Sequence, residues 1–477
     1  MEISVERYHY PIGQGMFSAQ IVGYGNGSSM LKNKYVCVYD CGSIPDGKNA
    51  MGHNRLKEYV DELYGLSGGV IHTLFISHFD DDHVNGLKHI FSRGFDVKKI
   101  IIPCMSRLQT IHSIWEISRE GGEFRIEAID NARVYVEIMI NKNISEGDDP
   151  IRIPENTIVE KSAEIPRIEN VNVSNSKFSQ KSIWEFTHFT LTPGYDGDLE
   201  RQFYEKVFFD KACLNNPLHY LVPDQFDYIL HGAEVTLAGA WESSLRNRID
   251  SKDRDDISDV MKEINKSMRD LYTDFFKSLA NEHKYSLNRN KASLILYSGI
   301  SDNLIKTDCC KKSYCSCIPV SFKPVVKVEG RSLNLQYEGD GSYEFLQDPK
   351  QGKLESFRWC GWLGTGDAQL NTKDYIDELE GSLGKLRMSR IEEITAPHHG
   401  SRYNSNEDFY EKFRRDGEVV CIIHSDVNRK NPHPHGEVVG DMKRNSIIPV
   451  NVTLDADTKY LRKIYIDVCS RCLFYSD

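Results

Sequence analysis

Residues 74–86 read L-F-I-S-H-F-D-D-D-H-V-N-G, and this stretch decides what the rest of the chain must build. The apolar run at 71–76 is short and follows Gly68-Gly69, so it is expected to be a buried strand. Four side chains able to bind a metal come directly after it, namely His78, Asp80, Asp82 and His83. Imidazoles combined with carboxylates suit Zn or Mn. Three aspartates alone would indicate a solvated turn, but the two histidines favour a metal site at a strand end.

The composition is that of an ordinary soluble globular protein, with 477 residues, 40% hydrophobic and 27% charged. A formal net charge of −11 argues against broad nonspecific binding of polyanions, but it permits a local basic groove or phosphate contacts made through a metal. Neither a secretory signal nor an apolar run of about 18 residues occurs, so no membrane contact is expected. Without a secretion signal, we expect the 12 cysteines to be reduced and the protein to be cytoplasmic.

The periodicity of apolar residues predicts a layered α/β protein. A helix at 53–66 precedes the 71–76 strand. A helix-like segment at 84–92, a strand at 98–103 and a helix at 107–118 follow it. Beyond residue 359 helices alternate with strands, the helices at 373–386, 407–415 and 436–444 and the strands at 392–396, 419–423, 450–454 and 460–468. Strand-rich halves with alternating helices predict a four-layer αββα arrangement.

Residues 1–477 are expected to form one domain of this kind with three large insertions. The insertions fall at about 120–225 (irregular), 243–283 (helical) and 301–355 (cysteine-containing). The helical insertion carries an apolar stripe that we expect to pack in a core, with a lid or a partner-binding helix as the alternative. The third insertion contains four thiols in nine residues, which would form a structural zinc site or a metal-free loop: Cys309, Cys310, Cys315 and Cys317. Their spacing is not that of a standard zinc finger, which favours the metal-free loop.

Three later stretches also place polar residues where a strand ends. Asp367 closes L-G-T-G-D at 363–367, and His398 and His399 lie in A-P-H-H-G-S at 396–401. His433 and His435 flank a proline after the strand at 419–423. Each could be an ordinary turn, and an exposed proline-rich loop is the alternative for the last pair. Because open sheets present ligands at the carboxyl ends of their strands, we expect the three stretches to meet the residues at 78–83.

These motifs carry a resemblance to a known family. The H-x-D-x-D-H of 78–83, T-G-D at 365–367 and P-H-H-G-S at 397–401 resemble the metallo-β-lactamase superfamily. More narrowly they are similar to the DNA-processing hydrolase domain of ComEC-type competence proteins. Supporting marks are G-Q-G at 13–15, Y-D-C-G at 39–42, N-K-A-S-L at 290–294 and N-R with H-P at 428–434. The membrane channel of ComEC proteins has no counterpart in this sequence, so DNA uptake is not implied.

By position, the resemblance implies a site for two divalent metal ions, Zn or Mn. The ligands it implies are His78 and Asp80 for one ion, Asp82, His83 and His399 for the other, and Asp367 between the two. Asp40 would support the ligand loop without touching a metal, since such carboxylates orient metal-binding histidines. Asp80 stands where many members have a second histidine, and a further histidine before Asp367 is not evident, because neither His188 nor His231 lies in a convincing motif. An oxygen-rich site of this kind would favour Mn over Zn.

The resemblance implies hydrolysis of a phosphodiester in DNA or RNA by a metal-activated water. Asp82 would orient that water, and His398 or His433 would stabilise charge or protonate the leaving oxygen. One alternative keeps the fold and changes the bond to a lactone, thioester or β-lactam, which an acidic, apolar cleft without basic groups would favour. Another is a scaffold with a degenerate site in a multi-protein system, such as a defence system, with the insertions as surfaces for protein partners.

Overall fold

The computed structural model describes the chain in ranges separated by gaps. The described residues are 2–25, 33–44, 51–119, 125–129, 131–142, 150–175, 178–191, 199, 269, 273, 275–279, 292–301, 327–329, 333–337, 343–347, 360–414, 419–426 and 433–467. The chain divides into two compact units, the first containing Met1–Met105, Met139–Pro193 and Arg289–Asp477 and the second Ser106–Ile138 and Gly194–Asn288. The cysteines of the predicted zinc site lie outside the described residues. That zinc site therefore stays a prediction. The organisation of the chain as one domain with three insertions also stays a prediction.

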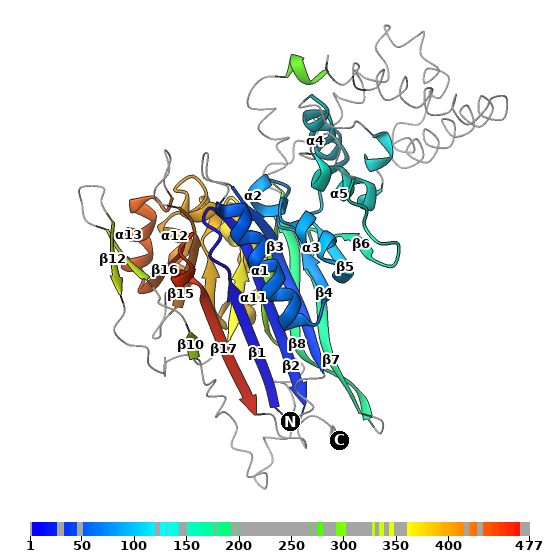
Figure 1. Cartoon of the computed structure of the whole chain (residues 1–477). Helices are drawn as coiled ribbons and strands as arrows, with labels where there is room; N and C mark the ends of the chain where they lie inside the picture. The colour runs from blue at the N-terminus through cyan, green and yellow to red at the C-terminus, as the bar shows by residue number, and fades with distance from the viewer. Residues whose placement is uncertain are drawn as a thin grey trace, which may run out of the picture. The chain divides into compact units, whose positions relative to one another are not determined.

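The first unit contains two mixed β-sheets (Figure 1). In the first sheet the strands are ordered β10-β17-β1-β2-β3-β4-β5-β6. Their bounds are β1 Glu2–His9, β2 Gly15–Gly25, β3 Lys34–Ser43, β4 Val70–Phe75, β5 Asp96–Ile102, β6 Ile158–Lys161, β10 Lys327–Glu329 and β17 Tyr460–Asp467. Strands β3 to β6 are parallel neighbours, and β1, β2 and β17 pair in antiparallel fashion. The predicted strand at 71–76 is β4, whose carboxyl end carries the histidine–aspartate motif.

The second sheet has the order β12-β11-β16-β15-β14-β13-β9-β8-β7. Its strands are β7 Arg167–Asn175, β8 Phe178–Leu191, β9 Ser293–Ile300, β11 Leu333–Tyr337, β12 Tyr343–Gln347, β13 Gly361–Gly364, β14 Ile391–Thr395, β15 Val419–His424 and β16 Ile447–Val452. Strands β13 to β16 run parallel, so their carboxyl ends share one edge of the sheet. The predicted motifs after β13, β14 and β15 therefore lie at that edge.

Helices cover the outer faces of both sheets. They are α1 Met51–Ser67, α3 Leu87–Arg93, α11 Lys373–Met388, α12 Glu407–Glu411 and α13 Gly436–Arg444. The short helix α2 Asp81–Val84 and the 3-10 turns η7 Pro397–Gly400 and η8 Ala456–Thr458 lie in segments that connect these elements. One buried core contains side chains of both sheets, including Tyr39 and Phe75 of the first and Trp184 and Trp362 of the second. A second core lies between the second sheet and α11 to α13, while α1 contacts β3, β4 and α3. The predicted four-layer α/β fold, with the sheets inside and the helices outside, is confirmed.

One local prediction was wrong, and another was right only in part. The segment 164–179, predicted as loop within an irregular insertion, contains β7, which pairs with β8 in a hairpin. Its apolar alternation is weak because it lies at the sheet edge: Ile168 is 44% exposed, whereas Val171 is buried. The helix predicted around 84–92 is interrupted at Gly86, so that α2 and α3 are separate.

The second unit contains α4 Arg107–Arg119, η2 Ile126–Ile129 and the beginning of α5 Ala132–Asn141. The ring of Phe276 lies 4.9 Å from that of Trp115 and 4.8 Å from that of His112. Phe275, a member of the predicted apolar stripe, is buried as expected of a core position. None of the helices within the described ranges combines the length and the apolar character needed to cross a bilayer.

Candidate metal centre

The loop after β4 is held by a buried carboxylate at the end of the neighbouring strand. Because β3 and β4 are parallel with Tyr39 opposite Phe75, Asp40 comes to lie beside Ser77. The Asp40 Oδ1 atom accepts a hydrogen bond from the Ser77 backbone N–H at 2.6 Å, and Oδ2 accepts from the Ser77 hydroxyl at 2.6 Å. Gly42 allows this approach, because a Cβ there would lie 2.4 Å from the backbone carbon of Asp82. The chain after β3 thus fixes the position of the metal motif.

The same hydrogen bonds assign the proton positions on two imidazoles. His83 Nδ1 lies 2.8 Å from Asp40 Oδ2, and a carboxylate only accepts, so Nδ1 carries the hydrogen. His78 Nδ1 lies 2.9 Å from Ser77 Oγ, whose own hydrogen is donated to Asp40, so His78 Nδ1 is also the donor. With the Nδ1 hydrogen donated in this way, His78 and His83 each leave Nε2 as the atom that would bind a metal once it carries no proton.

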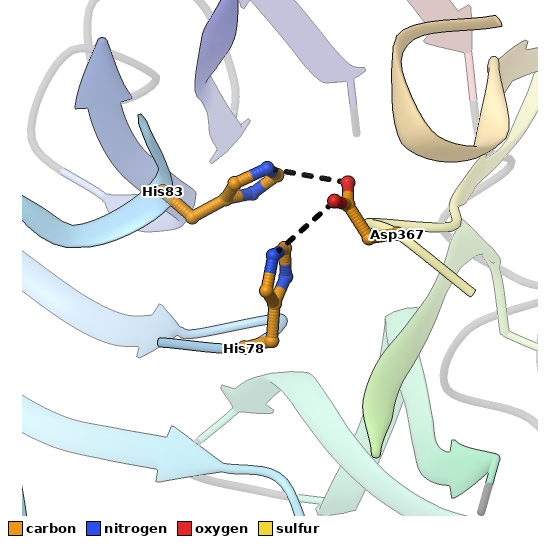
Figure 2. A group of neighbouring side chains, drawn as sticks. All are labelled: His78, His83 and Asp367. Atoms are coloured by element: carbon orange, nitrogen blue, oxygen red, sulfur yellow. Dashed lines mark ion pairs between the residues drawn. The ribbon is translucent and has the colours of Figure 1, made fainter. Parts of the chain in front are cut away.

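Both Nε2 atoms point at Asp367, which follows β13 (Figure 2). His83 Nε2 is 3.3 Å from Asp367 Oδ1 and His78 Nε2 is 3.4 Å from Oδ2. Asp367 reaches this place through Gly366, at φ 51°, where a Cβ would lie 2.6 Å from the Cβ of Ser77. Among the described residues, three buried atoms here have no hydrogen-bond partner: His78 Nε2, His83 Nε2 and Asp367 Oδ1. Buried imidazole and carboxylate atoms that face one another are costly unless a proton or a metal ion lies between them.

The spacing of these atoms fits a divalent ion. Two ligands that each lie about 2.1 Å from a metal, at right-angled or tetrahedral positions, are about 3.0–3.4 Å apart. A second group overlaps the first and contains Asp82, His83 and His399, whose ligand atoms all lie within 4.8 Å of one another. Within it, His399 Nε2 is 3.1 Å from Asp82 Oδ2. The described residues thus offer two adjoining sets of ligands that share His83.

The charges in the site reinforce this arrangement. Burial alone would raise the pKa of Asp82, but the hydrogen bond with His399 and the charge of His83 hold it below its usual range. Burial would likewise raise the pKa of Asp367, yet the charges of His398, His78 and His83 lower it well below the usual value. For His83, burial lowers the pKa, but the Asp367 and Asp40 carboxylates raise it well above the ordinary value. Two buried anions therefore create a potential that attracts a cation.

The two histidines of η7 are held in an uncommon backbone conformation that turns them in different directions. His398 and His399 have φ of 46° and 58°, a left-handed region that costs about 1–3 kcal/mol per residue. The side chain of His399 is 1% exposed and points to Asp82, whereas that of His398 is 41% exposed. His398 Nδ1 donates to Asn404 Oδ1 at 2.8 Å, because the Asn404 amide nitrogen donates to the Asp367 backbone oxygen. His398 Nε2 then lies 3.4 Å from Asp367 Oδ2, and this carboxylate raises the pKa of His398.

Not every residue expected in the site belongs to the two ligand groups. Asp80 Oδ2 is 3.9 Å from His78 Nε2, and its side chain is 27% exposed, so it lies at the margin of the first group. His433 is further out, with its ring 5.9 Å from that of His398, and burial lowers its pKa to about 3. His188 is hydrogen-bonded to Ser162 and is in neither group, and residue 231 lies outside the described ranges.

Comparisons with known proteins do not identify the chain. No protein-family model matches it, and no curated protein matches it either. Among solved structures, the crystal structure of a long form RNase Z from yeast aligns with 89% of this chain, at 9% sequence identity and a TM-score of 0.29. The alignment spans 37% of the yeast chain. A likeness at this level carries no information about activity, so the chemistry rests on the geometry of the site.

Three residues of the site were not found from the sequence. Ser77 precedes the motif at 78–83, and Asn404 follows the motif at 397–401. The only sign of their roles in the sequence was a side chain able to form hydrogen bonds next to a metal motif. The third is Lys142, whose ammonium group donates to the Phe79 backbone oxygen at 3.0 Å and lies 2.6 Å from the Asp81 carboxylate. The side chain of Lys142 is 7% exposed, so a buried cation holds the loop at Phe79 and Asp81, on either side of Asp80. Nothing in the sequence pattern links residue 142 to residue 81.

Proposed function

We propose that this chain is a metal-dependent phosphodiesterase that hydrolyses DNA or RNA with two divalent ions, Zn or Mn. One observation carries the proposal, namely the three buried atoms of His78, His83 and Asp367 that face one another without hydrogen-bond partners. Hydrogen bonds to Asp40 and Ser77 leave Nε2 of both imidazoles as the atom that would bind metal.

The residues divide into those that would hold the ions and those that would act on the substrate. His78 and Asp367, with Asp80 at the margin, would hold one ion, and Asp82, His83 and His399 the other. Asp367 suits a position between them, because its two oxygens face different imidazoles. When bound, two divalent ions supply an activated water and neutralise charge on the phosphoryl oxygens.

His398 is the imidazole best placed to meet a substrate. It is partly exposed, whereas His399 beside it is buried, and Asn404 fixes its orientation. A protonated His398 would stabilise charge on the phosphoryl group or donate to the leaving oxygen. Asp82 would orient the attacking water, since its Oδ2 atom is already fixed by His399. The ring of His433 lies 5.9 Å from that of His398, so His433 would act on the substrate through its contact with His398.

The surroundings of the site favour a phosphodiester over a lactone, thioester or β-lactam. An apolar and acidic mouth would suit the smaller esters, but the ring beside His398 is that of His433, followed by His435 and then by Arg402. Imidazole and guanidinium groups are donors suited to phosphate oxygens. The similarity of P-H-H-G-S to ComEC-type hydrolases supports the same choice. A protein partner on the insertions and a cytoplasmic location remain further proposals.

The test measures metal content and then cleavage of labelled single- and double-stranded DNA and RNA with added Mn or Zn. The double variant Asp82→Ala, His83→Ala removes two of the three ligands proposed for one ion and serves as the inactive control. We expect metal to copurify or bind on addition, and cleavage by the wild type alone. Bound metal with hydrolysis of small esters but of no nucleic acid would instead support the alternative substrate class. A protein that binds no divalent metal would disprove the proposal.

A further inference from the structure

A row of aromatic rings leads from the candidate metal centre to the protein surface. It begins at His398, whose Nε2 atom is 3.4 Å from Asp367, and continues through His433 at 5.9 Å between ring centroids. His435 follows at 4.7 Å from His433, and Tyr403 at 6.1 Å from His435. These four residues, the histidine–tyrosine row, come from two loops, 397–404 and 433–435. Of these four residues, only His398 and His433 were expected from the sequence to act on a substrate.

The two loops are tied together by backbone contacts. The His435 backbone N–H donates to the Gly400 oxygen at 3.0 Å, and the Arg402 backbone N–H donates to His435 Nδ1 at 3.2 Å. Gly400 permits this approach, because a Cβ there would lie 2.6 Å from the Cβ of Pro434. Since His435 Nδ1 accepts a hydrogen bond, the hydrogen of the neutral ring is on Nε2, where it is available to an acceptor. The row is therefore fixed relative to the metal ligands.

The outer end of the row is unusual because a large aromatic ring is left in solvent. Tyr403 is 62% exposed, one of a few large hydrophobic side chains that are so exposed among the described residues. The Arg402 guanidinium lies 5.0 Å from its ring centroid and donates to its hydroxyl at 3.0 Å. Arg402 also pairs with Glu437 at 3.1 Å, but both side chains are about half exposed or more, and such pairs contribute little. A phosphate could therefore compete with Glu437 for Arg402.

We propose that the histidine–tyrosine row is a binding track for single-stranded nucleic acid, with a base of the bound strand stacked on Tyr403 at its outer end. This inference rests on the proposed function and narrows its substrate class. A base can stack on an exposed ring only when it is not stacked in a duplex, which selects single strands. Imidazole and guanidinium groups along the row would contact the sugar–phosphate backbone. Stacking also suits a chain of net charge −11, because it does not depend on a broad positive surface.

The test is a cycle of two changes, one in the protein and one in the ligand. Binding of a fluorescent oligothymidylate with cleavage-resistant phosphorothioate linkages is measured by anisotropy in the metal-loaded protein. The ligand is compared with the same backbone in which every residue is abasic. Tyr403→Leu keeps an apolar side chain without a ring, and Tyr403→Phe keeps the ring and removes only the hydroxyl. Because Tyr403 is exposed, both variants are expected to fold as the wild type does.

Base–aromatic stacking contributes about 1–3 kcal/mol per base, so Tyr403→Leu should weaken binding of the oligothymidylate about 5- to 150-fold. Tyr403→Phe should bind within about 2-fold of the wild type, and the abasic ligand should bind equally to all three proteins. If Leu and Phe bind the oligothymidylate alike while the wild type cleaves nucleic acid, the track is wrong and the proposed function stands. Ring-dependent binding without cleavage supports the track and contradicts the phosphodiesterase. A wild type that binds no oligonucleotide overturns the track outright.

Discussion

Replacing Asp40 by asparagine tests whether the hydrogen-bond network around Ser77 sets the metal affinity. The carboxylate accepts three hydrogen bonds, from the Ser77 N–H at 2.6 Å, the Ser77 hydroxyl at 2.6 Å and His83 Nδ1 at 2.8 Å. Asparagine keeps the size of the side chain but has only one oxygen. Whichever way the amide is oriented, its NH₂ group faces a donor, either the Ser77 N–H or His83 Nδ1. The amide most easily relieves this conflict if His83 moves its proton to Nε2.

A proton on His83 Nε2 would occupy the lone pair that faces Asp367 and remove one metal ligand from both groups. Changes to residues that orient metal-binding histidines reduce affinity about 10- to 100-fold, or about 1.4–2.7 kcal/mol. We therefore expect Asp40→Asn to weaken Zn or Mn binding by that factor. Competition with a fluorescent chelator at fixed pH measures it, and urea unfolding in excess chelator measures the stability of the metal-free fold separately.

The matched control is the same chemical change at Glu393, which is also fully buried and contacts neither His78 nor His83. Glu393→Gln should lower stability and leave the metal affinity within about 2-fold. The explanation through proton positions is refuted if Asp40→Asn, folded by circular dichroism, binds metal as tightly as the wild type. It is equally refuted if both variants lose metal affinity in proportion to their loss of stability.

Two further predictions concern residues away from the ligands. Lys142→Met removes the cation that holds the loop through Phe79 and Asp81, so metal affinity should fall about 10-fold by calorimetric titration, with Lys142→Arg intermediate. Burial alone would raise the pKa of Glu393, but Arg7, His9 and Arg462 hold that pKa well below the usual value. Ionised Glu393 therefore adds its full amount to the free energy of unfolding above about pH 4.3, and this stabilisation is lost on acidification. Glu393→Gln should therefore cost about 3–5 kcal/mol of unfolding free energy at pH 7 in urea titrations, and that difference from the wild type should shrink below about pH 4.

The sequence was sufficient for the parts of the fold that follow from local patterns. The strand before His78 is bounded by glycines and ends in polar residues, and the alternation after residue 359 reproduced β14, β15 and α13. The edge strand β7 was missed because its own residues alternate only weakly between apolar and polar. It forms a strand through its antiparallel pairing with β8. Motifs recovered His78, His83 and Asp367 as neighbours, since strand ends in parallel sheets meet at one edge.

What the sequence did not reveal depends on contacts between distant segments. Lys142 reaches Asp81 across an interval of the chain without any pattern, and Tyr403 has significance only because His435 packs beside it. The exact place of Asp80 is also not given by the motif: its carboxylate lies 3.9 Å from His78 Nε2, and its role as a ligand stays a prediction. A motif specifies which residue types are present but not the fine position of each side chain.

The site joins the two sheets, so metal binding and the packing of the sheets cannot be independent. Asp40, His78 and His83 come from the first sheet and its loops, whereas Asp367 and His399 follow strands of the second. An ion held by both sets binds only the packed arrangement, and it therefore stabilises the fold by an amount that grows with its concentration relative to the dissociation constant. Without a metal ion or a proton between them, the imidazole and carboxylate atoms that face one another would oppose that packing. Glu393 and the two arginines it pairs with, one on β1 and one on β17, join the sheets elsewhere and need no metal. The packing of the two sheets therefore depends on a cation at the metal centre and not at Glu393.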